Sequence, residues 1–329
     1  MIDVHTLSIK KTCKQINSKI GTNTDAAGAG TVFAGLAESM ALLRAYTETD
    51  PNLMFVINGL LSDSASLRDW AFRQDSIGQA INEAFELNSD ALAACTSVEE
   101  IAANSTAITA ISSSTEAIAV CKYNNVLLPI LINYVSEDEL ILAAGLGYLK
   151  YAVGDTVRLT YYGEVKIFRV VHKNYKTTNK IVLVSEDILT NATWATGGAN
   201  NYSTSDLRTF LNSTVLSGFS DEIQNAIVVT SVACHNNTTA VTCKDKIWAL
   251  SYAEVGLGTN TYAPAEGSAL SYFNSAARRI KYLNGTAAYW WLRTPRTYNT
   301  YYAWGVGSSG SGSHNDVTDS YGVVPAFEI

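Results

Sequence analysis

The sequence predicts an α+β protein with a helical first half and a strand-rich second half. The chain has 329 residues, of which 47% are hydrophobic, which is enough for more than one core. Ala, Leu, Ile and Ser dominate before about residue 150, and Val, Thr, Tyr, Trp and Gly after it. We therefore expect a helical region over 1–97, a neck and linker over 98–150, and a strand-rich domain over 151–329.

The charge pattern excludes several classes of protein. Charged residues make up 16% of the chain, against about 25% in an average soluble domain, and the formal net charge is −7. Such a chain is not expected to bind nucleic acid through a basic face. No apolar run approaches the length of a membrane-spanning helix. Residues 1–11 lack the apolar stretch of a secretory signal, so we expect no membrane insertion and assembly in a cytoplasm.

Helical periodicity runs through the first half. Residues 20–38 begin with turn residues and continue into an apolar-periodic stretch. Residues 64–94 are expected to form one or two helices, because their apolar side chains recur three and four residues apart. Residues 125–134 are apolar but interrupted by Pro129, and the glycines within 135–154 indicate a hinge-bearing connection.

A degenerate heptad repeat occupies residues 98–120. Ile101 and Ile108 are seven residues apart, and so are Asn104 and Ile111. Isoleucine at both core positions of a heptad favours trimers, and an asparagine in the seam sets the register. This pattern predicts a short trimeric coiled-coil neck. The alternative is an ordinary amphipathic helix that packs on a globular core.

Short β-branched runs between turn residues begin after residue 150. They predict strands over 157–160, 166–172 and 180–185. A helix is expected over 203–216, where Ser205 provides an N-cap, and a second one over 221–227. Extended segments are expected at 228–233 and 246–251.

The motifs of common enzymes are missing from this sequence. The four histidines are scattered and none has metal-ligand spacing. Residues 305–310 match a dinucleotide-binding pattern, but no strand–helix unit surrounds them. Acidic residues occur singly or on helix surfaces. We expect no catalytic residues, no metal and no cofactor.

The chain has five cysteines and no C-x-x-C motif. An odd count fits a reduced compartment better than a disulfide framework. Cys234 and Cys243 could pair across a hairpin, but buried free thiols are the favoured interpretation.

The C-terminal tract has an unusual composition. Two apolar segments, WWLRTP at 290–295 and YGVVPAFEI at 321–329, enclose a stretch rich in Tyr, Ser, Gly and Asn. These residue types dominate antibody-like binding loops. Residues 296–302 and 307–319 also lack Lys, Glu, Gln, Met and Trp. No codon for these five residue types ends in a pyrimidine, so their absence is what randomisation of Asn-type codons with an unchanged third base would leave. A surface loop without a role is the alternative, but the aromatic residues clustered around Tyr301 favour a binding site.

These residues resemble the C-terminal signature of C-type-lectin-like variable proteins of diversity-generating retroelements. Such domains, whose fold is shared with formylglycine-generating enzymes, occur in phage tail proteins and bacterial surface proteins. One departure is Val324, where the family usually carries Arg, which puts one ion pair in doubt. The resemblance runs through the segments VGDTVRL at 153–159, IFRVV at 167–171, KIVLVSEDIL at 180–189, YSTSDLRTFLN at 202–212, FSDEIQNAI at 219–227 and DKIWALSYAE at 245–254.

The resemblance implies a variable ligand-binding face on a constant scaffold. Trp290, Trp291, Leu292, Gly322, Pro325 and Ala326 would be scaffold. The implied ligand-binding residues are Arg296, Thr297, Tyr298, Asn299, Thr300, Tyr301, Tyr302, Trp304, Ser308, Ser309, Ser311, Ser313, His314, Asn315, Asp316, Thr318 and Asp319.

The resemblance further implies a receptor-binding protein of a phage tail fibre, located in the virion. Its partners would be a host surface protein or glycan, other copies of itself in a homotrimer, and tail proteins attached through residues 1–97, where 20–36 resemble tail-fibre sequences. The alternatives are a bacterial surface protein with the same domain, and an enzyme of the formylglycine-generating type. Calcium-dependent sugar binding is not expected, because no Glu-Pro-Asn or Trp-Asn-Asp triplet is present.

Overall fold

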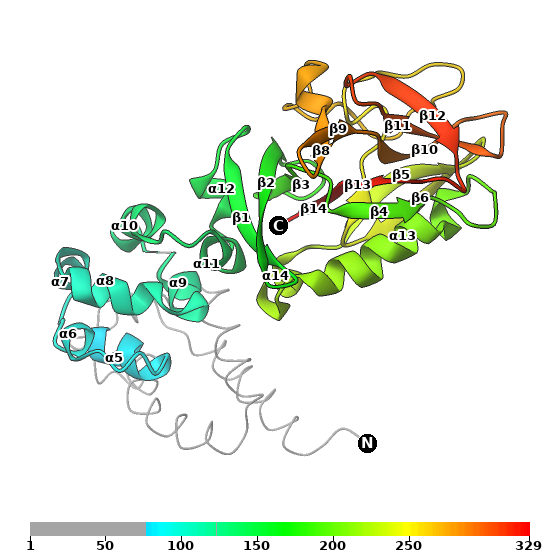
Figure 1. Ribbon diagram of the computed structural model, residues 1–329. Helices are drawn as coiled ribbons and strands as arrows, with labels where there is room; N and C mark the ends of the chain where they lie inside the picture. The colour runs from blue at the N-terminus through cyan, green and yellow to red at the C-terminus, as the bar shows by residue number, and fades with distance from the viewer. Residues whose placement is uncertain (1–76, 123) are drawn as a thin grey trace, which may run out of the picture. The chain divides into compact units, whose positions relative to one another are not determined.

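The computed structural model describes residues 77–122 and 124–329. They form two compact units that divide between Tyr134 and Val135 (Figure 1). The apolar-periodic stretch within 20–38 lies outside the described residues, as does the start of the region 64–94, where one or two helices are expected. The mixture of helices and sheets confirms the α+β class. No helix in the described part of the chain is long and apolar enough to cross a membrane.

The first unit consists of short helices around one apolar core. Serine or asparagine side chains accept hydrogen bonds from the first-turn N–H groups of several of them, which fixes where each helix begins. The helices are α5 (Ile77–Ala84), α6 (Asp90–Ala93), α7 (Val98–Ala103), α8 (Ser105–Ser112), α9 (Thr115–Cys121) and α10 (Leu127–Tyr134).

The structure corrects the expected coiled-coil neck, because the stretch 98–120 is not one helix. The chain breaks at Asn104, whose Oδ1 accepts hydrogen bonds from the backbone N–H groups of Thr106 and Ala107, each at 3.1 Å. It breaks again before α9, which Ser114 caps. The seam isoleucines Ile101, Ile108 and Ile111 are buried against other helices of the same chain. The amphipathic pattern is therefore satisfied within one molecule, as in the alternative interpretation.

Pro129 does not interrupt α10. It lies in the first turn of the helix, where an N–H group has no helical partner and proline is tolerated. Asn124 precedes this turn, and its Oδ1 accepts hydrogen bonds from the N–H groups of Val126 (2.8 Å) and Leu127 (3.1 Å).

The second unit begins with two short helices in the region expected to be a hinge. They are α11 (Asp138–Ala143) and α12 (Gly147–Lys150). Asp138 accepts a hydrogen bond from the N–H group of Arg158 at 2.7 Å, and Glu139 accepts one from that of Thr160. Both carboxylates thus pair with N–H groups on the outer edge of strand β1. Without them these N–H groups would be free to pair with a strand of another chain.

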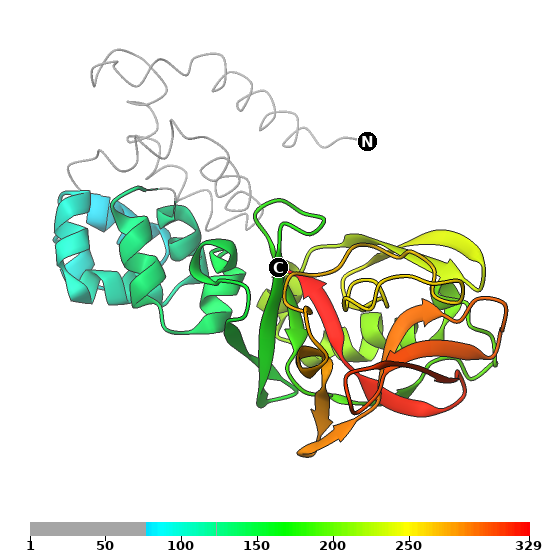
Figure 2. The same cartoon turned by 90° about the horizontal axis from the view of Figure 1, so that it is seen from above.

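One five-stranded sheet joins the start and the end of this unit. Its order is β1-β2-β3-β14-β7 and all its pairs are antiparallel. The strands expected at 157–160, 166–172 and 180–185 are confirmed as the first three. Figure 2 shows the red β14 beside the green strands. The strands are β1 (Thr156–Tyr161), β2 (Glu164–Lys173), β3 (Ile181–Ser185), β14 (Pro325–Glu328) and β7 (Trp248–Ala249).

A second five-stranded sheet carries most of the C-terminal tract. Its order is β12-β11-β10-β13-β4, with β10 and β13 parallel and the other pairs antiparallel. The expected scaffold residues of WWLRTP and YGVVPAFEI are all buried. The strands are β4 (Thr190–Thr193), β10 (Trp290–Pro295), β11 (Tyr302–Val306), β12 (Gly312–Asp316) and β13 (Ser320–Val323).

Helices and two hairpins complete the second unit. The helix expected over 203–216 begins as α13 (Asp206–Phe210), and Ser205 caps it by accepting a hydrogen bond from the N–H group of Arg208 at 3.1 Å. It continues through a π-turn over Leu211–Val215 and is followed by α14 (Asp221–Ala226). The hairpins pair β5 (Thr230–Asn236) with β6 (Thr239–Asp245), and β8 (Lys281–Leu283) with β9 (Thr286–Ala288).

Candidate ligand-binding surface

The hairpin of β11 and β12 forms one edge of the second sheet. In Figure 1 it lies on the upper side of the second unit, and α13 runs along the lower side. The turn between the two strands is anchored at Gly310, which has a φ of 79° and leaves no room for a side chain. A Cβ there would lie 2.0 Å from the carbonyl oxygen of Ala276. The turn therefore requires glycine at this position.

Aromatic rings gather on one face of this hairpin. Trp304 on β11 is directly opposite His314 on β12, and their ring centroids are 5.2 Å apart. Tyr302 contacts His314 at 5.5 Å, and Tyr252, from another loop, contacts Trp304 at 4.7 Å. The Trp304 indole N–H donates to the carbonyl oxygen of Tyr262 at 2.8 Å. We call these five residues the aromatic face.

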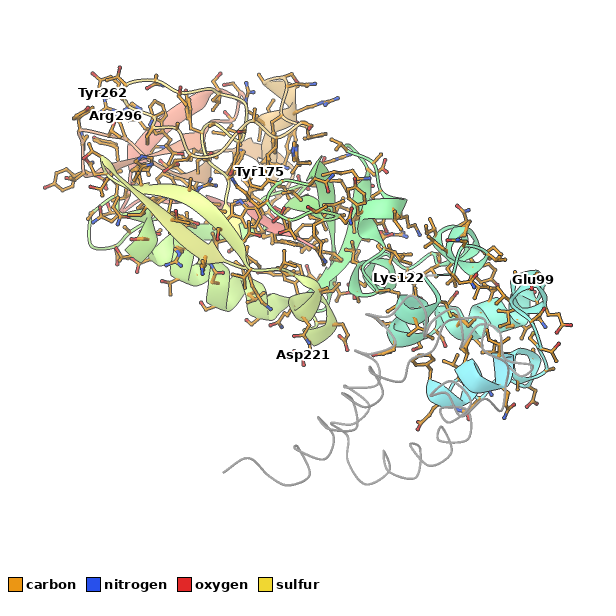
Figure 3. The ribbon with its side chains drawn as sticks, turned by 180° about the vertical axis from the view of Figure 1, so that it is seen from behind. Glu99, Lys122, Tyr175, Asp221, Tyr262 and Arg296 are labelled. Carbon is orange, nitrogen blue, oxygen red and sulfur yellow. The ribbon has the colours of Figure 1, made fainter. Side chains whose placement is uncertain are left out.

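Arg296 lies beside the aromatic face. Its guanidinium carbon is 4.5 Å from the centroid of the Tyr262 ring, which is a cation–π contact (Figure 3). Its Nε is buried without a hydrogen-bond partner among the described residues. Partial burial and the positive charge of Arg296 lower the pKa of His314, which favours the neutral form of its ring.

The buried residue Asn200 forms hydrogen bonds along the main chain of the loop 296–302. Its Nδ2, which carries two hydrogens, lies within hydrogen-bond distance of the carbonyl oxygens of Arg296 (3.1 Å), Asn299 (2.8 Å) and Tyr302 (2.7 Å), so one hydrogen is shared between two acceptors. Its backbone N–H donates to the carbonyl oxygen of Thr300 at 2.8 Å. Every one of these contacts uses the main chain of the loop, so the side chains of the loop are not needed for them.

Most of the residues expected to bind ligand are accessible, and the tyrosines are the most exposed. Tyr298 is 75% exposed and Tyr301 is 61% exposed. The other exposed members are Thr300, Ser308, Ser309, Ser311, His314, Thr318 and Asp319, and the half-buried ones are Arg296, Asn299, Tyr302, Trp304, Ser313, Asn315 and Asp316.

Thr297 is the exception in this set and is corrected here. Its side chain is buried, with 5% exposure, and its hydroxyl donates to the carbonyl oxygen of Thr261 at 2.7 Å. Its backbone N–H donates to the carbonyl oxygen of Tyr262 at 3.1 Å. Thr297 thus fastens the loop 296–302 to the loop before β8 and does not face a ligand.

The expected residues do not all lie on one surface. Side chains alternate along β12, so Ser313 and Asn315 point away from His314 and the aromatic face. They share the opposite face of the hairpin with Gly305, whose missing side chain makes room for the ring of Tyr289. Asp316 is engaged locally, since its Oδ1 accepts hydrogen bonds from the N–H group (2.9 Å) and hydroxyl (2.7 Å) of Thr318.

Sequence reasoning missed Asn200, Tyr252 and Tyr262. Tyr262 ends a Gly, Thr and Asn-rich stretch, GTNTY at 258–262, whose composition matches that of the C-terminal tract. That composition could have identified it. Asn200 lies in a stretch of similar composition, GGANNYST at 197–204, which could have identified it as well. Tyr252 carries no such signal, because its role depends on contacts with residues far along the chain.

A buried polar network lies beneath this surface. Arg293 pairs with Glu254 through two contacts of 2.6 and 2.7 Å, and both side chains are fully buried. Glu266 accepts a hydrogen bond from Thr294 at 2.5 Å and lies 3.1 Å from His235 Nδ1. The charged and hydrogen-bonding groups of these side chains are therefore paired with one another. Within residues 77–122 and 124–329, no cluster of three or more His, Cys, Asp or Glu side chains could hold a metal ion.

The comparisons with known proteins identify one similarity. Residues 178–329 match a family described as a domain of unknown function, DUF6273. No curated protein and no solved structure matches the chain. The matched residues include both strands of the hairpin and the loop 296–302.

Proposed function

We propose that this chain is a receptor-binding protein and that the loop 296–302 and the aromatic face contact its ligand. The observation that carries the proposal is the exposure of Tyr298 and Tyr301 on a loop whose main chain is fixed by Asn200. Two large exposed rings on a fixed backbone supply contact area at little cost in conformational entropy. Tyr, Trp and Arg are also the residues that dominate binding energy at protein interfaces.

The same arrangement supports diversification of the ligand-binding residues. Asn200 holds the loop through carbonyl oxygens, so the side chains at 298, 300 and 301 are free to change without loss of its contacts. The turn of the hairpin depends on Gly310, which is not among the residues expected to bind ligand. A stable scaffold with replaceable side chains is what a C-type-lectin-like variable domain of a retroelement requires.

The biological setting that fits this proposal best is the tail of a phage. There the described C-terminal unit would bind a protein or glycan of the host surface, and the N-terminal half would attach to other tail proteins. A bacterial surface protein with the same domain is the second candidate. A trimer would need contacts other than the isoleucine seam of 98–120, because that seam is buried within one chain.

Binding of the labelled full chain to a panel of bacterial cells tests the proposal. The double substitution Tyr298→Ala and Tyr301→Ala should abolish binding and leave the melting temperature nearly unchanged, since both rings are exposed. Tyr282→Ala is the matched control, because Tyr282 is 44% exposed on β8 and should retain binding. Equal binding by the double variant and the wild type would contradict the proposal.

The genome supplies an independent test of diversification. A template repeat of the 3′ end of the gene, differing only at adenines, should lie near a reverse transcriptase gene. Its absence would remove the retroelement from the proposal and leave a receptor-binding protein with a constant face.

A further inference from the structure

Cys234 on β5 and Cys243 on β6 lie against each other inside a hairpin. Their Sγ atoms are 2.7 Å apart, and both side chains are buried. In the antiparallel register Cys234 is opposite Val241 and Cys243 is opposite Val232, so the two cysteines share one face of the ribbon. Both thiols are free in the structure. A small approach of the two Sγ atoms would bring them to the length of a covalent S–S bond, about 2.05 Å.

The contact between the two sulfur atoms makes the two thiols unequal in the closed hairpin. The hydrogen bond with Cys234 lowers the pKa of Cys243 and outweighs burial, while the positive charges of Arg208 and Arg293 add to this effect and the negative charge of Asp245 opposes it. The same hydrogen bond, together with burial, raises the pKa of Cys234. Thiolate is the form that attacks a disulfide.

We infer that Cys234 and Cys243 form a disulfide when the chain folds in the presence of a low-molecular-weight disulfide such as oxidised glutathione. One of the two cysteines, as its thiolate, attacks one sulfur of that disulfide and releases the first thiol. The other cysteine, as its thiolate, then attacks the protein sulfur of the mixed disulfide and releases the second thiol. The protein thiols are oxidised, one small disulfide is reduced to two thiols, and those thiols carry the two protons that the protein loses.

The exchange must take place before the hairpin closes or while it is transiently open. Both sulfur atoms are shielded from solvent in the folded state, so the small disulfide has no access to them there. The formed bond would then oppose reopening of β5 and β6.

This hairpin also contacts the residues that hold the loop 296–302, so the disulfide has a structural consequence outside the hairpin. At its tip, Asn237 Nδ2 donates to Asn200 Oδ1 at 3.1 Å, and Asn236 Nδ2 donates to the hydroxyl of Ser203 at 2.7 Å. Asn200 in turn holds the loop 296–302. A cross-linked hairpin keeps Asn237 in place and thereby slows opening of that loop. Neither the bond nor this coupling depends on the proposed function.

Peptide mapping of the full chain tests bond formation. Both cysteines fall in one tryptic peptide, Thr209–Lys244, because no Lys or Arg lies between its ends. The chain is refolded with either reduced or oxidised glutathione, denatured, alkylated and digested. After oxidised refolding we expect this peptide to carry no alkyl group and to be lighter by two hydrogens, whereas after reduced refolding it should carry two alkyl groups. A doubly alkylated peptide under both conditions would overturn the inference.

Hydrogen exchange of the refolded chain tests the coupling. In the oxidised form, amide exchange in the peptide that covers 296–302 should slow about threefold or more, and the melting temperature should rise by roughly 5 °C. Exchange in the turn 174–180 serves as the internal reference and should not change.

Two variants control the exchange experiment. Cys234→Ala should behave identically under both conditions, and Cys121→Ala, which alters a buried thiol of the first unit, should keep the difference. A bond that forms without slowing exchange at 296–302 would overturn the coupling.

Discussion

The side-chain amide of Asn200 donates a hydrogen bond of 2.7 Å to the carbonyl oxygen of Tyr302, at the point where the loop 296–302 enters β11. Asn200 lies about a hundred residues before that loop and is completely buried. The contact explains how a loop of exposed and hydroxylated side chains keeps one conformation. Its order comes from a residue that a ligand does not reach.

Substitution of Asn200 should therefore disorder the loop. Asn200→Ala removes a donor from three carbonyl oxygens and leaves that of Asn299 without one, since those of Tyr302 and Arg296 keep backbone N–H donors. We expect the second unit to lose about 2 kcal/mol of stability. Asn200→Asp should cost more, because a carboxylate would face those carbonyls at the same distances. Urea denaturation measures both effects. Thr300→Ala, an exposed change in the same loop, is the control and should stay within about 0.5 kcal/mol of the wild type.

The buried pair of Arg293 and Glu254 should be intolerant of loss of its negative partner. Glu254→Gln keeps the shape of the side chain but removes the carboxylate that pairs directly with Arg293 in a fully buried site, so that the charge of Glu266 alone opposes it there. We expect a loss of about 3–5 kcal/mol in the free energy of unfolding. The exposed Glu164→Gln, which breaks a surface pair with Lys166, should change stability little. Equal effects of the two substitutions would contradict this account.

Lys281 should make the stability depend on pH in the alkaline range. Its ammonium group is buried and donates to the carbonyl oxygens of Ser185 (2.6 Å) and Glu186 (2.9 Å). Burial lowers the pKa of Lys281 from 10.5 to about 8, while the charges of Glu186 and Asp187 oppose the shift. Above about pH 8 the folded chain has released this proton and the unfolded chain still holds it, so the contribution of Lys281 becomes more favourable as pH rises.

Comparison with Lys281→Met isolates that contribution from other titrating groups. Between about pH 8 and about pH 9.5 the stability of the wild type should rise relative to the variant by up to about 2 kcal/mol. Denaturation curves of both proteins across this range give the difference. A difference that stays constant with pH would show that Lys281 titrates normally.

The isoleucine seam of the first unit should act within one chain. Ile111→Ala removes part of a fully buried side chain and should destabilise that unit by about 2–4 kcal/mol. Because the seam is packed inside one molecule, the unfolding midpoint of this unit should not depend on protein concentration. Light scattering and melting over a hundredfold concentration range check this. A midpoint that rises with concentration would instead support a coiled-coil trimer.

Local sequence patterns were sufficient for several elements. The β-rich run at 157–160 predicted β1, and in the structure one face of that strand is buried and the other exposed. Ser205 was recognised as a helix cap from its type and position alone. The exposure of Tyr298 and Tyr301 followed from the loop composition around them. In each case the physical cause acts over a few neighbouring residues.

Only the tertiary structure decided what the distant segments do together. The spacing of Ile101 and Ile108 indicates that one helical face is buried. The same spacing is expected whether the surface that covers this face belongs to the same chain or to another chain. The burial of Thr297 and the support from Asn200 likewise arise from residues far apart in the chain. Sequence by itself therefore determined the class, the strands and the exposed tyrosines. Folding decided which surface covers the isoleucines and which residues hold the loop 296–302. Both outcomes depend on contacts between distant segments, which no local pattern encodes.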